Sequence, residues 1–129
     1  MKIEHIALWT EDIDRLTDFY VKYFSAEAGS RYHNPSKGFE SCFLSLSGGG
    51  RLEVMHLRRK SPEVLPPDIH HMGLSHFAIA VGSEQRVDTL TSRIQSDGFE
   101  VLNAPRRTGD GYYESVVLDP DGNRIEITV

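Results

Sequence analysis

The chain has 129 residues, of which 39% are hydrophobic and 26% are charged, as expected for one compact domain with an ordinary hydrophobic core. Its net charge is −5, and its basic residues are scattered apart from two short runs, which argues against a nucleic-acid groove. No apolar run is long enough for a membrane-spanning helix, and the first residues do not resemble a signal peptide. The single cysteine, Cys42, can form no internal disulfide, so we expect a cytoplasmic protein.

The first half of the chain predicts a strand, a helix and two further strands. These elements cover residues 3–9, 13–24, 40–47 and 51–57. Thr10 follows the first strand and is a reasonable helix cap. The helix shows apolar residues at helical spacing, and the last two strands are joined by Gly48-Gly49-Gly50. Residues 29–39 are rich in turn-forming residues.

The second half repeats this order. Strands are expected over residues 74–81, 99–102, 113–118 and 124–129. A helix lies between a capping Ser83 and Gly98, where helices commonly stop. The segment Asp119–Asn123 is a strong turn signal before the last strand. Residues 58–73 are rich in proline and charge and are interpreted as a linker. The sequence thus predicts an α+β fold of two mixed sheets, packed together or joined into one curved sheet, with helices outside.

Each half also carries one histidine on its first strand and one glutamate on its last strand. The four residues are His5, Glu53, His76 and Glu126. Strand residues alternate between faces, so each of the four lies opposite the large aliphatic side chains that we expect to pack on the helices. A carboxylate on a half-buried face is costly unless it is paired or coordinated. This arrangement occurs twice, which favours a metal site.

Two imidazoles and two carboxylates suit Zn, Ni, Co, Mn or Fe(II). The remaining histidines are interpreted as structural or solvated: His33, His56, His70 and His71. Cys42 has no neighbouring base in the sequence, so a nucleophilic role has little support.

With these residues in view, the chain resembles the vicinal oxygen chelate superfamily, the glyoxalase, bleomycin-resistance and extradiol-dioxygenase group. The segments that carry the resemblance are Ile3–Ala7, Asp18–Tyr20, Leu52–Val54, Gly73–Ala78 and Asp119–Glu126. The resemblance covers nearly the whole chain and implies one domain over residues 1–129. It would consist of paired βαβββ modules over residues 1–57 and 74–129 that form a curved cup. It also implies a divalent metal on the inner strands and, in many members, a homodimer.

Ligand identity separates the members of this group. The set His5, Glu53, His76 and Glu126 is similar to that of glyoxalase I-like members. Extradiol dioxygenases use two His and one Glu, and bleomycin-binding members generally lose the ligands. Bacterial glyoxalase I-like members commonly place Arg and Asn, for glutathione, where this chain has Trp9 and Leu57. The resemblance therefore supports metal chemistry better than it supports glutathione as the substrate.

The leading hypothesis is a metal-dependent, glyoxalase I-like lyase or isomerase whose small-molecule substrate chelates the metal through adjacent oxygens. Glu126, or else Glu53, would remove a proton from carbon. The residues predicted to contact the substrate are Trp9, Met55, Arg107 and Tyr113. Arg106 and the loop at residues 108–111 lie where a substrate anion would be held. Two alternatives in the same fold are an Fe(II)-dependent ring-cleaving dioxygenase and a protein that binds a toxic small molecule without chemistry.

Overall fold

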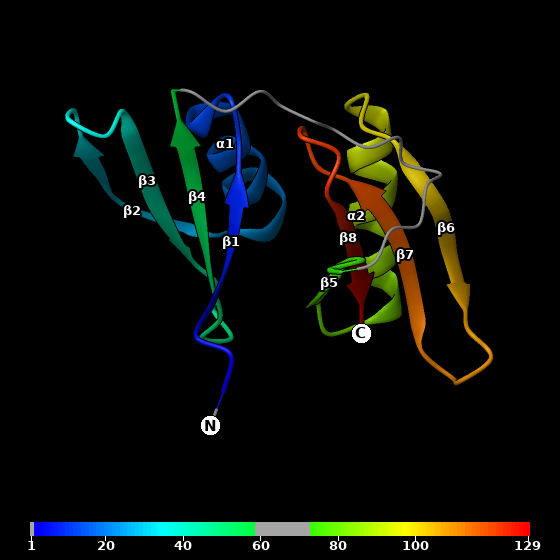
Figure 1. Cartoon of the computed structure of the whole chain (residues 1–129). Helices are drawn as coiled ribbons and strands as arrows, with labels where there is room; N and C mark the ends of the chain where they lie inside the picture. The colour runs from blue at the N-terminus through cyan, green and yellow to red at the C-terminus, as the bar shows by residue number, and fades with distance from the viewer. Residues whose placement is uncertain (1, 59–72) are drawn as a thin grey trace. The chain divides into compact units, whose positions relative to one another are not determined.

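The computed structural model describes residues 2–58 and 73–129. The chain divides into two compact units, residues 1–63 and 64–129, and each unit is a four-stranded mixed sheet with one helix against it (Figure 1). The α+β fold of two βαβββ modules is therefore confirmed. Most of the predicted linker, residues 59–72, lies outside the described residues. The predicted cup concerns how the two modules combine and stays a prediction.

Apart from β2, the first unit has its elements in the predicted order. They are β1 (His5–Trp9), α1 (Ile13–Phe24), β2 (Glu27–Asn34), β3 (Phe39–Ser45) and β4 (Arg51–Leu57). The sheet order is β1-β4-β3-β2. β1 runs parallel to β4, and the other neighbours are antiparallel. This topology places the first and last strands of the unit side by side at one edge of the sheet.

The second unit repeats this topology strand for strand. Its elements are β5 (Phe77–Ala80), α2 (Glu84–Ser96), β6 (Val101–Arg107), β7 (Tyr113–Leu118) and β8 (Arg124–Thr128). The sheet order is β5-β8-β7-β6, with β5 parallel to β8. Again the first and last strands are neighbours, so the two units present equivalent positions for the residues that the sequence singled out.

One face of each sheet is buried against its helix. In the first unit, α1 contributes a stripe of buried side chains at helical spacing, Ile13, Leu16, Phe19, Tyr20 and Tyr23. The strands contribute Leu8, Cys42, Leu44, Leu52 and Val54. Burial of these apolar side chains is the main stabilising contribution to the unit. Because strand residues alternate, their chain neighbours occupy the other face of the sheet.

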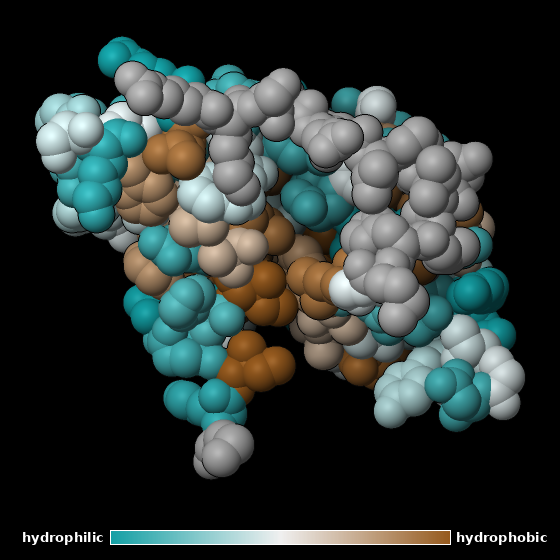
Figure 2. Space-filling view, viewed as in Figure 1, coloured by the Kyte–Doolittle hydropathy of each residue, from teal (hydrophilic) through white to brown (hydrophobic). Residues whose placement is uncertain are grey.

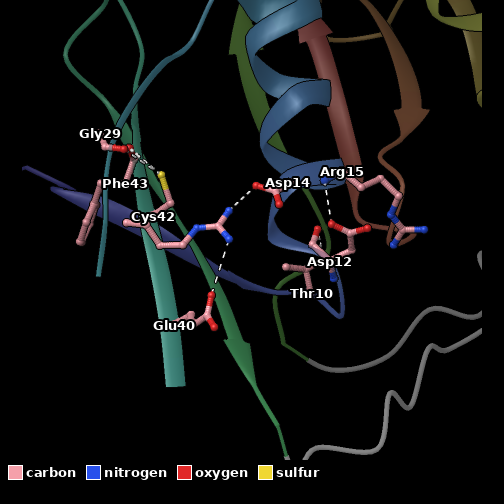
Figure 3. A network of polar contacts seen from close by, with 9 residues as sticks. Thr10, Asp12, Asp14, Arg15, Gly29, Glu40, Cys42 and Phe43 are labelled. Carbon is pink, nitrogen blue, oxygen red and sulfur yellow. Dashed lines mark hydrogen bonds and ion pairs between the residues drawn. The ribbon is translucent and has the colours of Figure 1, made fainter. Parts of the chain in front are cut away.

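The N-cap of helix α1 lies two residues later than predicted. Asp12 is the N-cap, and its carboxylate accepts a hydrogen bond from the Arg15 backbone N–H at 3.0 Å. The Thr10 hydroxyl instead bonds to the backbone of Asp12, accepting from its N–H and donating to its carbonyl. A carboxylate satisfies an unpaired N–H at the positive end of the helix dipole, so Asp12 takes the role expected of Thr10 (Figure 3).

Strand β2 is an addition to the predicted elements, because residues 29–39 were expected to be mostly turns. All but one of its residues are exposed, and it carries a bulge between Ala28 and Arg31. The Arg31 guanidinium pairs with Asp14 of α1 and lies 3.6 Å from the Glu40 carboxylate of β3. Figure 3 shows Asp14 and Glu40 with these two contacts. Ion pairs and backbone pairing thus hold a strand that has little apolar burial.

In the second unit, α2 is capped by Ser83, as predicted, and packs on the face that holds Ile125 and Ile127. Two buried hydroxyls lie within this packing. Thr91 donates to the Val87 carbonyl at 2.7 Å, and its oxygen lies 2.6 Å from the Ser115 hydroxyl oxygen. Since the Thr91 proton goes to Val87, Ser115 is the donor of the shorter contact.

Within the described residues, no helix is both long enough and apolar enough to cross a membrane.

Candidate metal centre

The strand register places the two glutamates at equivalent positions. Glu53 on β4 lies opposite Ala7 on β1, and Glu126 on β8 lies opposite Ala78 on β5. Each alanine is two residues after the histidine of its unit, and so on the same face of the sheet. Alanine has a small side chain, so it takes up little room beside the histidine and the glutamate. The duplicated spacing in the sequence therefore becomes a duplicated site.

In the first unit, Nε2 of His5 lies 3.8 Å from Oε2 of Glu53. The His5 side chain is 38% exposed and the Glu53 side chain 18%. The rings of His5 and of Phe43 on β3 are nearly perpendicular, with ring centroids 5.3 Å apart. Phe43 is the direct cross-strand partner of Glu53. This pair therefore lies over an aromatic surface.

The other nitrogen of His5 is also engaged. Nδ1 lies 2.6 Å from Oε2 of Glu4, and Oε1 of Glu4 pairs with the Arg51 guanidinium. The hydrogen bond with His5 holds the pKa of the Glu4 carboxyl below its ordinary value, and Arg51 adds to this effect. Glu4 is therefore an ionised acceptor at neutral pH.

In the second unit, Nε2 of His76 lies 3.2 Å from Oε2 of Glu126. His76 lies immediately before β5 rather than within it, yet its ring still turns toward Glu126. The other nitrogen of the ring, Nδ1, is 3.4 Å from the Ser75 hydroxyl. The pair is thus the counterpart of His5 and Glu53, but Nδ1 of its histidine contacts a serine instead of a glutamate.

A third carboxyl group adjoins Glu126. Glu114 on β7 is 9% exposed and lies 3.3 Å from the Arg106 guanidinium of β6. Burial raises the pKa of the Glu126 carboxyl above its ordinary value; the neighbouring Glu114 carboxyl raises it further, and the charge of His76 opposes them. Sequence reasoning did not single out Glu114. Glu114 lies three residues before the core residue Val117. Strand alternation therefore places Glu114 on the opposite face of the sheet, the face that carries Glu126.

The donor atoms of each pair are suitably placed for one divalent ion. Two ligand atoms at about 2.1 Å from an ion lie about 3.0 Å apart at a right angle and about 3.4 Å apart at the tetrahedral angle. The observed separations are 3.2 Å for the second unit and 3.8 Å for the first, so a small rotation of one side chain would suffice there. Among residues 2–58 and 73–129, no three His, Cys, Asp or Glu side chains converge as a metal-binding group. Each unit therefore has two candidate ligands, one histidine and one glutamate.

Trp9 and Met55 lie on the same face as Glu53, opposite each other on β1 and β4. Trp9 is 42% exposed, and its ring meets Phe39 edge-on with centroids 6.3 Å apart. The Tyr32 ring is also close to Phe39, tilted against it with ring centroids 6.1 Å apart. The space-filling view shows hydrophobic residues exposed among polar ones (Figure 2). The predicted contact residues of the first unit are thus part of an aromatic strip beside its His–Glu pair.

Arg107 and Tyr113, the predicted contact residues of the second unit, do not lie on the same face as its glutamate. The Tyr113 hydroxyl donates to Asp88 of α2 at 2.7 Å, and the Arg107 guanidinium pairs with Glu84 of α2. Both therefore lie on the helix face of their sheet, opposite the face that carries Glu126. The hydrogen bond to Asp88 raises the pKa of Tyr113. Their role in substrate binding stays a prediction, while Arg106 shares the Glu126 face through Glu114.

The other described histidines have different surroundings. His56 lies on the helix face of β4, and its Nδ1 donates to the Thr10 carbonyl at 3.0 Å. His33 is an exposed residue of β2, 3.7 Å from Glu40. Cys42 is buried. His70 and His71 lie outside the described residues.

The sequence comparison identifies the family. The chain belongs to the glyoxalase/bleomycin resistance protein/dioxygenase superfamily, whose family model matches residues 2–127. Among curated proteins it is similar to YqjT of Bacillus subtilis, an uncharacterized protein that is 26% identical over 130 residues, covering 97% of this chain and 96% of YqjT. The resemblance to the superfamily that the motifs predicted is confirmed.

Solved structures show the same fold. A glyoxalase/bleomycin resistance protein/dioxygenase domain from Frankia sp. matches with a TM-score of 0.85 at 16% identity, covering 100% of this chain and 97% of that one. Glyoxalase I from Zea mays matches with a TM-score of 0.77 at 22% identity. That match covers 98% of this chain but 44% of the maize chain. At these identities the likeness establishes the fold alone.

Proposed function

We propose that this protein is a metal-dependent lyase or isomerase of the glyoxalase I kind, which moves a proton on a small molecule that has adjacent oxygens. The observation that carries the proposal is the pair of donor atoms in each unit. Nε2 of the histidine faces Oε2 of the glutamate at 3.8 Å in the first unit and 3.2 Å in the second. Membership of the superfamily supports this reading of the two pairs.

The proposed metal ligands are His5, Glu53, His76 and Glu126. Imidazole and carboxylate donors suit Zn, Ni, Co or Mn, and Fe is less expected with two carboxylates. A divalent ion held there would polarise the oxygens of a chelating substrate and so make the neighbouring C–H bond more acidic. Four ligands in an octahedral site leave two positions for those oxygens.

Glu126 is the proposed base, with Glu53 as the second choice. Its carboxylate takes the proton from the substrate carbon and returns it to the neighbouring atom, so one group serves as base and then as acid. The surroundings of the two glutamates differ. Glu53 faces the Phe43 ring across the strands, whereas Glu126 has Val116 opposite and Glu114 beside it. Glu126 therefore adjoins a second carboxyl group and, through it, Arg106.

The first unit also supplies the proposed surface for the rest of the substrate. Trp9 and Met55 lie on the Glu53 face and would contact an apolar substituent. We include a cytoplasmic homodimer in the proposal, as many members of the superfamily are dimers. The identity of the substrate, and the use of glutathione in particular, is left to experiment.

Metal content tests the proposal directly. The purified protein is analysed beside His5→Ala and Glu126→Ala, with His33→Ala as a matched control, because His33 is a histidine outside both pairs. We expect near-stoichiometric metal in the parent and in His33→Ala, and loss of metal from the other two variants. Metal that remains in all four proteins would contradict the proposed ligands.

The same measurement separates the alternatives. Bound iron together with oxygen uptake on catechol would identify a ring-cleaving dioxygenase. An absence of metal, even after incubation with Ni, Co, Zn and Fe(II), would leave a small-molecule-binding protein. In that case ligand affinity should survive His5→Ala.

A further inference from the structure

The hydrogen bond between Glu4 and His5 defines which nitrogen of the His5 ring is free. A carboxylate accepts but does not donate, so the 2.6 Å contact places the proton on Nδ1 of His5. In the neutral imidazole, Nε2 then carries the lone pair. That nitrogen is the one directed at Glu53. The free lone pair of His5 is thus oriented toward the proposed metal position before any ion binds.

Glu4 is itself held in place. Its second oxygen pairs with Arg51 on β4, and the Arg51 guanidinium lies over the Phe43 ring, 4.2 Å from the ring centroid. Phe43 also meets the His5 ring edge-on. His5 is therefore fixed by a hydrogen bond at Nδ1 and by an aromatic contact. The Glu4 side chain is 54% exposed, so this arrangement is not part of the core.

The second unit has a different residue at the equivalent place. Ser75 precedes His76 as Glu4 precedes His5, and its hydroxyl lies 3.4 Å from Nδ1 of His76. A hydroxyl can donate or accept, so it does not select one form of the ring. The contact is also longer and has no charge. The tautomer of His5 is therefore fixed by its neighbour more firmly than the tautomer of His76.

We propose that Glu4 is a positioning residue, which keeps His5 protonated at Nδ1 with Nε2 directed at Glu53. His5 is then held in the metal-binding tautomer more firmly than His76. Hydrogen bonds from a ligand histidine to a carboxylate fix its tautomer and strengthen it as a donor. This inference rests on the metal site of the proposed function, which it deepens.

The tautomer is the first test and needs no metal. Imidazole 15N chemical shifts and couplings are recorded by NMR on the metal-free protein, at a pH about two units above the reference imidazole pKa of about 6.5. His5 should be protonated mainly at Nδ1 in the parent and mainly at Nε2 in Glu4→Ala. Ser75→Ala is the matched control and should leave His5 unchanged. A parent His5 protonated mainly at Nε2, or no change in Glu4→Ala, would overturn the inference.

Metal affinity is the second test. Zn dissociation constants are measured by competition with a chelator for the parent, Glu4→Ala, Glu4→Gln and Ser75→Ala. We expect Glu4→Ala to weaken binding about tenfold or more, Ser75→Ala to have a smaller effect, and Glu4→Gln to recover part of the loss, because its amide oxygen still accepts from Nδ1. Thermal unfolding of each variant checks that it is folded.

The two tests separate the two proposals. A parent that binds no Zn would refute the metal site, while the NMR spectra would still decide whether Glu4 selects the tautomer. A parent that binds Zn no more tightly than Glu4→Ala would refute the positioning role and leave the metal site intact.

Discussion

Glu114 and Glu126 lie diagonally across strands β7 and β8, two residue pairs apart in the register and on the same face of the sheet, and Glu114 raises the pKa of the Glu126 carboxyl. Two neighbouring carboxyl groups cannot both be ionised without repulsion, which raises the pKa of one of them. Burial acts on Glu126 in the same direction and more strongly. The first unit has Ser41 where the second has Glu114, so this arrangement distinguishes the two halves of an otherwise duplicated site.

The raised pKa of Glu126 predicts how the stability of the metal-free protein depends on pH. The folded pKa lies above the unfolded value, so between the two values the folded state binds more protons and stability falls as pH rises. The penalty is complete above the folded pKa. Glu126→Gln removes it and should therefore stabilise the metal-free protein at neutral pH. The advantage should shrink as the pH falls to the ordinary carboxyl range.

Urea unfolding of the metal-free parent and Glu126→Gln across this pH range makes the comparison. The acid end serves as an internal control, because both proteins are then neutral at position 126. A variant that is less stable than the parent at every pH would mean that the Glu126 carboxylate is stabilised rather than penalised by its surroundings.

The same substitution that should stabilise the protein should slow catalysis, because it removes the proposed base. In metal-loaded protein, Glu126→Gln should slow proton transfer by about a hundredfold or more, the usual contribution of a general base. Deuterium exchange from D2O into hydroxyacetone, a small molecule with adjacent oxygens, reports this step by NMR without requiring a thiol. Glu100→Gln, an exposed acid of the same unit, is the control. Unchanged exchange in Glu126→Gln would move the role of base to Glu53.

The two His–Glu pairs could be predicted from the sequence because strand alternation is strict. Once Val54 and Ile125 were assigned to the helix face, the neighbouring glutamates had to lie on the other one. The parallel pairing of the first and last strands then brought each histidine close to its glutamate. His76 shows the limit of this reasoning, because it precedes its strand yet reaches the same place.

Other features depend on pairing that the local sequence does not encode. Strand β2 has almost no buried residues, so it lacks an apolar pattern and is held by backbone pairing and Arg31. Arg107 and Tyr113 were assigned to a site, but α2 supplies Glu84 and Asp88 as their partners. Contacts between a helix and a sheet edge connect residues far apart in the chain, and one sequence alone does not show them.

Trp9 allows the proposed substrate surface to be tested by spectroscopy. It is the one tryptophan in the sequence, so its fluorescence reports on this face alone. Benzohydroxamate and acetohydroxamate carry the same pair of chelating oxygens and differ in their substituent. With metal bound, benzohydroxamate should change the Trp9 emission more and should bind more tightly.

Calorimetry on two Trp9 variants supplies the control. Trp9→Ala should reduce the preference for benzohydroxamate about three- to tenfold, in line with the contribution of an aromatic pair, whereas Trp9→Phe should retain most of it. Equal preference in all three proteins would exclude Trp9 from the substrate surface.

Arg31 should matter for local rather than global stability. Its ion pairs with Asp14 and Glu40 are partly exposed, so Arg31→Met should cost no more than about 1 kcal/mol in the free energy of unfolding. Hydrogen exchange should nevertheless rise at the amides of β2, because this edge strand has few other contacts with α1. Lys37→Met, in the turn after β2, should leave the exchange of β2 unchanged, and equal exchange in both variants would assign the strand to backbone pairing alone.

The buried hydroxyl pair of the second unit makes a prediction about coupling. Thr91→Val keeps the shape of the side chain but removes the acceptor of the Ser115 hydroxyl, which is fully buried. A buried donor without a partner costs about 1–3 kcal/mol. Adding Ser115→Ala removes that donor, so the double variant should recover part of the loss. Urea unfolding of both single variants and the double variant gives the coupling energy, with Thr89→Val, an exposed position of α2, as the control for valine in a helix. Additive effects would mean that Ser115 finds another acceptor when Thr91 is replaced.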